Sequence, residues 1–368
     1  MSRAVLITGA RAPVAVDLGR SLAAAGYAVH FADSVTPWGA RMSSAATAIH
    51  RLAPPRTEFA AFARDLAALA DRIDPVAIIP TCEEVFYVSA TGLPKVLAPP
   101  LPILRKLHSK VDFAHHVAAL GLEAPETWRV ESRIEIAALP CAPSDLVFKP
   151  EFSRFATDTL ICPTMAPKVT RPLAAQRFIA GEEVCLWSFA RAGEIIAAAA
   201  YRPRWRHRRS AAYAFELAQC PAALVVARAI AAADNITGHL SFDFIMTPDG
   251  TAIPIECNPR AVSGLHLFDA HPDLARAMLG TGQANAPTTN LRYLGPAMAL
   301  LGPVTGRLGD LLSDMRAGRD VVGRAGDRLP MLGAVIDAAR FAIQGMLAGR
   351  HASEQSTHDI EWNGQPIG

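Results

Sequence analysis

Apolar positions in the first part of the chain fall into short runs that alternate with longer amphipathic stretches. The runs at 3–8, 28–32 and 76–80 predict buried strands, and helical spacing predicts helices at 14–25 and at about 58–73. Strands that alternate with helices are typical of a parallel sheet with right-handed crossovers. We therefore expect a Rossmann-like α/β domain over residues 1–98.

The turn after the first predicted strand, Gly9 to Pro13, lacks the G-x-G-x-x-G spacing. That spacing allows a backbone to approach a pyrophosphate closely. A dinucleotide site in this domain is therefore not expected.

The hydrophobic pattern changes near residue 110. A predicted helix is followed there by short strands separated by turns and then by a helix at 222–233. Strands in runs, rather than in strict alternation with helices, favour an α+β unit. We place this unit at 99–280, with a small lobe at about 110–175 and a large lobe at about 176–280.

The last part of the chain, residues 281–368, shows helical spacing at 307–317 and 332–348, followed by a polar tail from His351. We expect a mostly helical C-terminal extension that covers the preceding domain or forms an oligomer. No chemistry is apparent in it.

Composition favours a folded enzyme without a strong global charge. The chain has 368 residues, of which 51% are hydrophobic and 19% charged, and its net charge is +2. It is long enough for two or three domains, is not disordered, and has no overall attraction to nucleic acid or to a membrane.

Two further features of the sequence point to the cytoplasm. The six cysteines form no Cys-x-x-Cys pair, which predicts reduced thiols and no structural zinc. The first apolar run is too short for a secretory signal, and no stretch is expected to span a membrane.

The most informative segment is His239 to Arg260, which reads HLSFDFIMTPDGTAIPIECNPR. Two apolar runs flank a Thr-Pro-Asp-Gly turn, so the segment predicts a hairpin. Asp243 is expected at the end of the first strand, and Glu256 and Asn258 at the end of the second. Two carboxylates and an amide oxygen suit Mg²⁺, which takes one or two carboxylates together with substrate phosphates.

This segment resembles the metal-binding end of the ATP-grasp superfamily, in which an acid is followed by a strand and by Glu-x-Asn-Pro-Arg. Lys110, before an amphipathic helix, and Lys149, in Val-Phe-Lys-Pro, are similar to the two lysines that hold ATP phosphates in that family. The run from Gln176 to Glu183 is similar to its hinge strand. The resemblance covers roughly residues 100–280, and the first 95 residues fit the α/β domain that commonly precedes it.

The resemblance implies a two-lobed body that binds ATP and Mg²⁺, with Mn²⁺ as an alternative ion. Asp243, Glu256 and Asn258 would hold the metal, and Glu183 would contact ribose. Arg260 would act with Lys149 in catalysis, because a planar guanidinium suits an acyl phosphate. The hinge residues implied in nucleotide binding are Gln176, Arg177, Phe178 and Ile179.

Three parts of the sequence depart from the family pattern or lie outside it. The loop after Lys149 has no glycine, so Ser153 and Arg154 are expected to provide side-chain donors to the phosphates. Arg177 stands where an acid is common, which leaves adenine contacts to the backbone. An arginine-rich stretch at 201–209 is expected to be a lid over an anionic substrate, with RNA binding or an exposed, solvated loop as the alternatives. Its candidate residues are Arg206, Arg208 and Arg209.

The resemblance implies an ATP-dependent carboxylate-amine ligase that activates an acid as an acyl phosphate and makes an amide or peptide bond. Its partners would be a small carboxylate and an amine, and a homodimer is the expected assembly. His266 and His271 lie downstream as candidates to accept the proton of the amine. The alternatives are a bicarbonate-using carboxylase or carbamoyl-phosphate-type enzyme, and a non-catalytic nucleotide- or RNA-binding protein.

Overall fold

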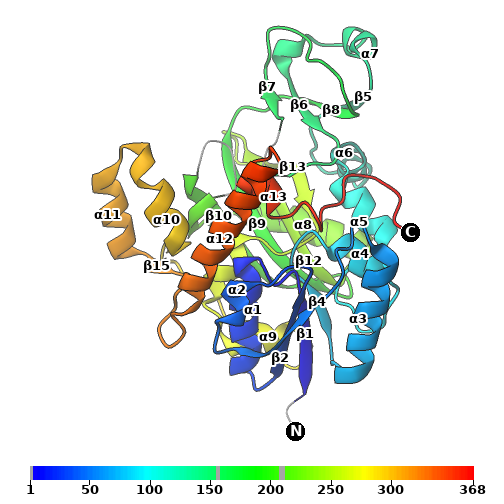
Figure 1. Cartoon of the computed structure of the whole chain (residues 1–368). Helices are drawn as coiled ribbons and strands as arrows, with labels where there is room; N and C mark the ends of the chain where they lie inside the picture. The colour runs from blue at the N-terminus through cyan, green and yellow to red at the C-terminus, as the bar shows by residue number, and fades with distance from the viewer. Residues whose placement is uncertain (1–2, 155–157, 207–211) are drawn as a thin grey trace.

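The computed structural model describes residues 3–154, 158–206 and 212–368, so Arg208 and Arg209 of the predicted lid lie outside the described residues. Figure 1 shows an N-terminal domain at the bottom, a larger sheet behind its centre and a small lobe at the top. The predicted order of an α/β domain, an α+β body and C-terminal helices is confirmed. No described helix is both long and apolar enough to cross a membrane.

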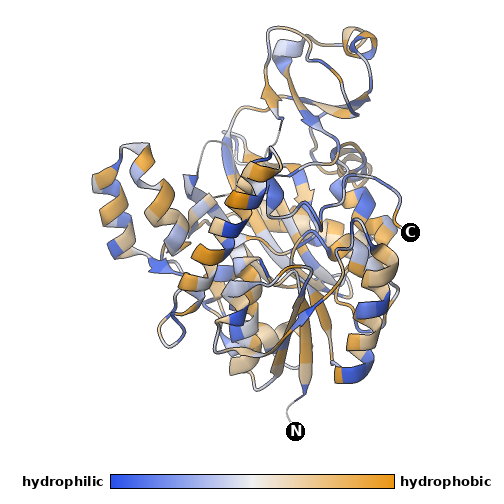
Figure 2. Ribbon diagram, viewed as in Figure 1, coloured by the Kyte–Doolittle hydropathy of each residue, from blue (hydrophilic) through white to orange (hydrophobic). Residues whose placement is uncertain are grey.

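The N-terminal domain is built on a four-stranded parallel sheet with the strand order β3-β2-β1-β4. Its strands are β1 (Ala4–Thr8), β2 (Ala28–Asp33), β3 (Ala46–Arg51) and β4 (Ile78–Pro80). Its helices are α1 (Pro13–Ala24), α2 (Trp38–Arg41), α3 (Phe59–Ile73) and α4 (Val85–Ala90). The apolar strands at the centre of this sheet are orange in Figure 2. The sequence did not predict β3, because its residues are mostly half-buried or exposed and carry no apolar run.

The small lobe is a four-stranded antiparallel sheet with the order β5-β8-β6-β7. Two helices lead into it and two short helices lie within it. The bounds are α5 (Leu101–His108), α6 (Lys110–Ala119), β5 (Thr127–Val130), α7 (Arg133–Ala137), η1 (Pro143–Asp145), β6 (Leu146–Pro150), β7 (Leu160–Ile161) and β8 (Leu173–Arg177). Ser109 caps α6 by accepting a hydrogen bond from the Asp112 N–H, which fixes Lys110 at the first position of the helix.

The large lobe contains a seven-stranded sheet with the order β13-β12-β9-β10-β11-β14-β15. Its strands are antiparallel except for the β14–β15 pair. The strand bounds are β9 (Glu182–Arg191), β10 (Glu194–Arg206), β11 (Ala212–Leu217), β12 (Gly238–Met246), β13 (Ala252–Asn258), β14 (Arg292–Tyr293) and β15 (Arg319–Asp320). The sheet therefore continues past residue 280 into the C-terminal extension, which was expected to be mostly helical.

Alternation along β9 decides what covers each face of this sheet. Leu186 lies in a buried cluster with α8 (Pro221–Ala233) on one face. Trp187 points the other way, into a cluster shared with α1, η2 (Ser263–Phe268) and α9 (Pro272–Met278). Because successive side chains of a strand point to opposite faces, one strand holds both layers together. The N-terminal domain is thereby packed against the large sheet.

The C-terminal extension returns to the N-terminal domain. Its helices are α10 (Gly295–Leu301), η3 (Pro303–Thr305), α11 (Leu308–Ala317), α12 (Pro330–Leu347) and α13 (Ala352–Gln355). A Cβ added at Gly333 would lie 2.3 Å from the Trp38 carbonyl oxygen, so this glycine allows α12 to pack directly on α2. Near the chain end, Trp362 stacks on Phe86 of α4 with ring centroids 4.9 Å apart.

A candidate nucleotide and metal site

A cavity of about 750 Å³ lies where the small lobe, the large sheet, the N-terminal domain and α12 meet. This volume is in the range of pockets that hold cofactors and small substrates. Many of the residues predicted from the sequence line it. Those residues are Lys149, Ser153, Gln176, Arg177, Phe178, Ile179, Glu183, Arg206, Asp243, Glu256, Asn258, Arg260 and His266.

The candidate metal ligands come from one face of the β12–β13 hairpin. Asp243 pairs directly with Glu256, and Asn258 lies two residues further along β13, opposite Ser241. Cys257, between the two ligands, is buried in the cluster under the opposite face. Asp243 lies within β12 rather than at its end as the sequence suggested, because β12 continues to Met246 before the turn.

The electrostatics of this carboxylate pair are asymmetric. Burial and the neighbouring Glu256 raise the pKa of Asp243 above its ordinary value. Burial alone would also raise the pKa of Glu256, but the cations Lys110 and Lys149 lower it. The chain's own cations thus compensate the charge of Asp243 less fully than that of Glu256, which fits a site for a bound cation.

The oxygen atoms of the candidate metal ligands suit a metal ion that also binds a phosphate group. No described group of three or more histidine, cysteine or acidic side chains is arranged to hold a metal ion. The hairpin instead supplies two carboxylates and one amide oxygen. Such a set is typical of Mg²⁺ that completes its coordination with phosphate oxygens and water.

The two predicted lysines lie beside the carboxylates. The Lys110 Nζ is 3.6 Å from the Glu256 Oε2 and donates to the Ser153 carbonyl oxygen at 3.1 Å. The Lys149 Nζ donates to the Gln176 Oε1 at 3.0 Å, and burial lowers the pKa of Lys149 to about 8. The side chain of Gln176, predicted to contact the nucleotide at the hinge, is therefore engaged with Lys149.

The predicted hinge follows β8. The Arg177 N–H donates to the Glu126 carbonyl oxygen and the Phe178 N–H donates to the Asp145 carbonyl oxygen, both at 2.8 Å. These two N–H groups are therefore not available to an adenine ring. Ile179 also borders the cavity.

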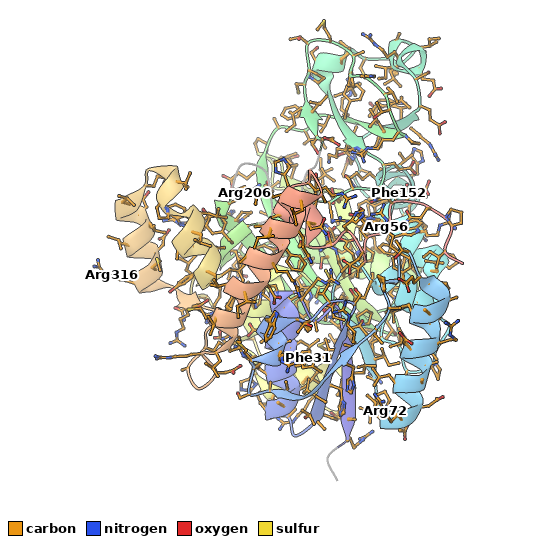
Figure 3. All side chains as sticks on the ribbon, viewed as in Figure 1. Phe31, Arg56, Arg72, Phe152, Arg206 and Arg316 are labelled. Carbon is orange, nitrogen blue, oxygen red and sulfur yellow. The ribbon has the colours of Figure 1, made fainter. Side chains whose placement is uncertain are left out.

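Arg206 is the one described member of the predicted lid triplet. Its Nη1 donates to the Glu183 Oε2 at 2.9 Å, on the neighbouring strand of the sheet. Figure 3 shows Arg206 at the end of a strand behind α12. Arg206 thus pairs with Glu183, the residue that is predicted to contact ribose.

Arg260 links the metal ligands to the N-terminal domain. Its Nε donates to the Glu83 Oε1 at 2.7 Å, and its Nη2 donates to the Asn258 Oδ1 at 3.0 Å. Glu83 is buried, which would raise its pKa, but Arg260 and Arg154 lower the pKa of Glu83 to about 2. We did not identify Glu83 from the sequence, although it lies three residues after the end of β4, at the edge of a parallel sheet where sites commonly form.

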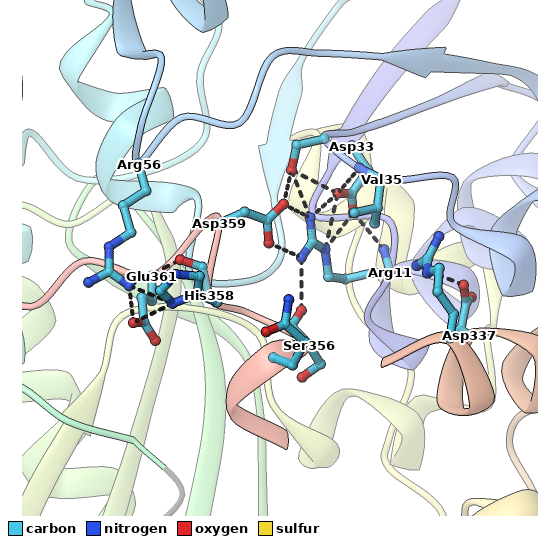
Figure 4. A network of polar contacts seen from close by, with 12 residues as sticks. Arg11, Asp33, Val35, Arg56, Asp337, Ser356, His358, Asp359 and Glu361 are labelled. Carbon is cyan, nitrogen blue, oxygen red and sulfur yellow. Dashed lines mark hydrogen bonds and ion pairs between the residues drawn. The ribbon is translucent and has the colours of Figure 1, made fainter. Parts of the chain in front are cut away.

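The loop after Lys149 is tied to the C-terminal tail. Ser153 donates from its hydroxyl to the Pro150 carbonyl oxygen at 3.3 Å. Arg154 forms an ion pair with Glu361, which also pairs with Arg56. Figure 4 shows Glu361 with Arg56 and His358. Arg154, predicted to contact phosphate, is therefore held by the tail.

The two histidines proposed as proton acceptors have different surroundings. His266 is buried, and its Nδ1 lies 2.6 Å from the Asp17 Oδ2 at the edge of the cavity. His271 caps α9 by accepting a hydrogen bond from the Asp273 N–H. Only His266 borders the cavity.

Comparisons with known proteins gave structural matches alone, because no family model and no curated protein sequence matched the chain. N5-carboxyaminoimidazole synthetase from Staphylococcus aureus, complexed with ADP, is similar with a TM-score of 0.63 and 12% identity, over 84% of this chain and 87% of that one. An L-amino acid ligase from Bacillus licheniformis is similar with a TM-score of 0.51 and 15% identity, over 72% and 68%.

A third similar structure is the biotin carboxylase domain of 2-oxoglutarate carboxylase from Hydrogenobacter thermophilus, complexed with MgADP, ADP and bicarbonate. Its TM-score is 0.59 and its identity 14%, over 79% of this chain and 73% of that one. At such low identity these likenesses establish a shared fold.

Proposed function

We propose that this chain, which has the ATP-grasp fold, is an ATP-dependent ligase that activates a carboxylate as an acyl phosphate and transfers it to an amine. The products would be an amide or peptide bond, ADP and phosphate. The observation that carries the proposal is the direct pairing of Asp243 with Glu256 in one cavity with the buried Lys149. The buried Lys110 lies beside Glu256.

The proposed chemistry needs positioning more than covalent catalysis. A carboxylate resists attack by an amine until phosphorylation converts one oxygen into a good leaving group. Phosphoryl transfer then requires alignment and neutralisation of phosphate charge. Mg²⁺ held by Asp243, Glu256 and Asn258 would supply that neutralisation at the terminal phosphates.

The chain's own cations complete the arrangement. Lys110 and Lys149 would neutralise the remaining phosphate charge from the small-lobe side, because Lys110 lies against Glu256 and Lys149 borders the cavity. Arg260, fixed by Glu83 and Asn258, would hold the acyl phosphate oxygens. Lys110 and Lys149 are buried, and burial strengthens the interaction of a charge with its partner.

The direct test is a screen of carboxylate and amine pairs scored by ADP and phosphate release. We expect release that needs both substrates and Mg²⁺, and an amide product in the same mixture. ATP turnover that ignores every amine would contradict the proposal.

A bicarbonate-using reaction is the second candidate, because two of the similar structures above are a synthetase named for a carboxyamino product and a carboxylase domain. The same screen includes bicarbonate as the acid. ADP release that depends on bicarbonate alone, with a carboxylated product, would favour this candidate.

The RNA-binding alternative is tested with the arginine stretch. Because Arg206 pairs with Glu183 at the cavity, we expect Arg206 to contact a small-molecule substrate rather than RNA. Replacement of Arg206, Arg208 and Arg209 by glutamine should raise the KM for the acid and leave the melting temperature nearly unchanged. RNA binding with a steep salt dependence in the parent, weakened in the variant, would favour the alternative.

A homodimer through α12 extends the proposal. In this 18-residue helix, Asp337 is buried and Arg340 is half-buried. Several large apolar residues of the helix are exposed instead. The outward residues follow one another at intervals of three and four, the spacing of helices that pair along a seam. They are Leu332, Val335, Ala339, Ala342 and Met346, all exposed.

Together with the exposed Ile343 beside it, this outward stripe is self-complementary. If two copies pair antiparallel about Ala339, Leu332 of one helix meets Met346 of the other, and Val335 meets Ile343. A two-fold interface requires such a match. Stable dimers bury about 1,200 Å² or more, so the exposed apolar residues of the neighbouring α10–α11 arm, such as Leu300 and Leu312, would add to the contact.

Sedimentation at several concentrations tests the dimer. Val335→Glu should yield monomers, whereas Gln344→Glu, exposed on the same helix but off the stripe, should leave the dimer intact. A parent chain that remains monomeric at tens of micromolar would contradict this interface.

A further inference from the structure

The cavity has a second part beyond the carboxylates and lysines. This part lies between the start of α1 and the inner face of α12, and it is lined mainly by apolar side chains. The residues that define it are Val14, Val322, Pro330, Ala334, Ala338 and Phe341. We call it the apolar chamber.

The first charged group bordering the chamber is Arg11. It donates to the Asp33 Oδ1 at 2.5 Å, to the Asp359 Oδ1 at 2.6 Å and to the Ser356 carbonyl oxygen at 2.8 Å. Figure 4 shows the guanidinium enclosed by these partners. Two carboxylates balance its charge, so Arg11 offers no free cation to a substrate.

The other charged or titratable groups at the chamber are also paired. Asp337 accepts from the Gly39 N–H at 3.1 Å and lies 3.0 Å from the Arg340 guanidinium. The Nδ1 of His266 lies 2.6 Å from the Asp17 Oδ2. Each charge at the chamber is thus balanced by a residue of the chain, and the wall between them is mainly apolar.

A charged substrate group would bind poorly in such a chamber. Burial of an ion without a partner is strongly unfavourable. Apolar surface, in contrast, gains free energy when it is removed from water. The preferred occupant is therefore an uncharged apolar group.

We infer that the acid substrate carries an uncharged apolar body, aliphatic or aromatic, which fills this chamber while its carboxylate lies at Arg260. The inference rests on the proposed function for the position of the carboxylate. The acid is the substrate that must meet the terminal phosphate, and the chamber continues from Arg260, Ala261 and Val262 in the same cavity.

Binding can be measured without turnover. Calorimetry in the presence of Mg²⁺ and a non-hydrolysable ATP analogue compares hexanoate with 6-aminohexanoate and adipate, which place a positive or a negative charge at the far end of a similar chain. 3-Phenylpropionate provides the aromatic probe. We expect hexanoate or 3-phenylpropionate to bind about 100-fold more tightly than either charged probe, because a buried charge without a partner is unfavourable.

A matched pair of variants locates the site. Ala338 lines the chamber and is exposed, so Ala338→Asp should fold. It should weaken binding of the apolar acid at least about 10-fold and leave the affinity for the ATP analogue unchanged. Ala348→Asp places the same charge at the exposed end of α12, away from the cavity, and should alter neither affinity.

Several results would overturn the inference: equal or tighter binding of 6-aminohexanoate or adipate, equal effects of the two aspartate variants, or no binding of either apolar acid. Failure of the proposed function looks different. If apolar acids bind as expected but no amine elicits ADP release, the ligase proposal fails and the chamber assignment stands. If only charged acids support turnover, the chamber assignment fails and the ligase proposal stands.

Discussion

Asp243 and Glu256 are direct partners across the antiparallel pair β12 and β13. Like charges opposite each other destabilise a sheet. Glu256 has the Lys110 Nζ at 3.6 Å, whereas the pKa of Asp243 stays raised by burial and Glu256 although Lys149 lowers it. The free site is therefore under electrostatic strain that a bound cation would relieve. Removal of the Asp243 charge should therefore lower activity but leave the free protein at least as stable as the parent.

The first prediction concerns this pair. Asp243→Asn and Glu256→Gln each remove one charge without a change of shape, so each should lower kcat at least about 100-fold by weakening metal-dependent stabilisation. Asp243→Asn should also melt at the same or a higher temperature than the parent in the absence of ligand, because burial and Glu256 raise the pKa of Asp243.

Turnover and melting of the two variants are measured side by side, with and without MgATP. The parent should gain melting temperature from MgATP, and the variants should gain less. Near-normal turnover in either variant would exclude the metal assignment.

The second prediction is a pH dependence of stability caused by Glu84. Burial raises the pKa of Glu84 to about 7, although its carboxylate accepts from the Thr8 hydroxyl at 2.8 Å and the Thr81 N–H at 3.1 Å. The folded state therefore binds the proton more tightly than the unfolded state. Stability should fall as pH rises from about 4.5 to 7, by about 3 kcal/mol at the upper end.

Urea unfolding of Glu84→Gln tests this dependence. The variant should be at least as stable as the parent at pH 8 and should lose this advantage near pH 4.5, where the parent carboxyl is neutral. A constant difference between the two proteins across this range would show that Glu84 is not the titrating group.

The third prediction uses Lys149. Burial lowers the pKa of Lys149 to about 8, so the free protein loses this cation as pH rises through that value. The KM for ATP should increase above pH 8. Lys149→Arg, which keeps its charge, should show a flatter profile, and Lys149→Ala should weaken both ATP binding and turnover at every pH.

Initial rates over a range of ATP concentrations between pH 6.5 and 9.5 provide the measurement. An equally steep rise in the KM of Lys149→Arg would assign the titration to another group, such as the nucleotide or the metal site.

The fourth prediction separates binding from catalysis at Arg260. Its guanidinium contacts Glu83 and Asn258 at once, through two nitrogens. A lysine carries a single nitrogen and does not reproduce this fork. Arg260→Lys should therefore lower kcat more than it raises the KM for ATP.

Titration of ATP against this variant distinguishes the two effects. If only the KM rises, Arg260 contributes to ground-state binding, and its assignment to the acyl phosphate loses its support.

Much of the fold follows from local pattern. The apolar runs and helical spacing of the first 98 residues predicted β1, α1, β2, α3 and β4, with ends within a few residues of those observed. The strand β3 escaped prediction because it lies at the sheet edge and is only half-buried. Edge strands bury one face or none, so their sequence carries little apolar signal.

The sequence by itself determined the candidate metal ligands as a group. A tight turn at 247–250 and a side-chain period of two place Asp243, Glu256 and Asn258 on one face of a hairpin, and both features are local. Lys110 and Lys149 were found only through resemblance to a family, since neither spacing nor composition links them to the hairpin.

Only the tertiary structure decided what surrounds these ligands. Glu83 meets Arg260 across 177 positions of sequence, Glu361 reaches Arg154 from the chain end, and α12 closes the apolar chamber from a region that carried no recognisable motif. Contacts of this kind arise where separate elements pack together. They leave no periodic trace in the sequence, because the positions of the partners depend on the whole fold and not on their neighbours along the chain.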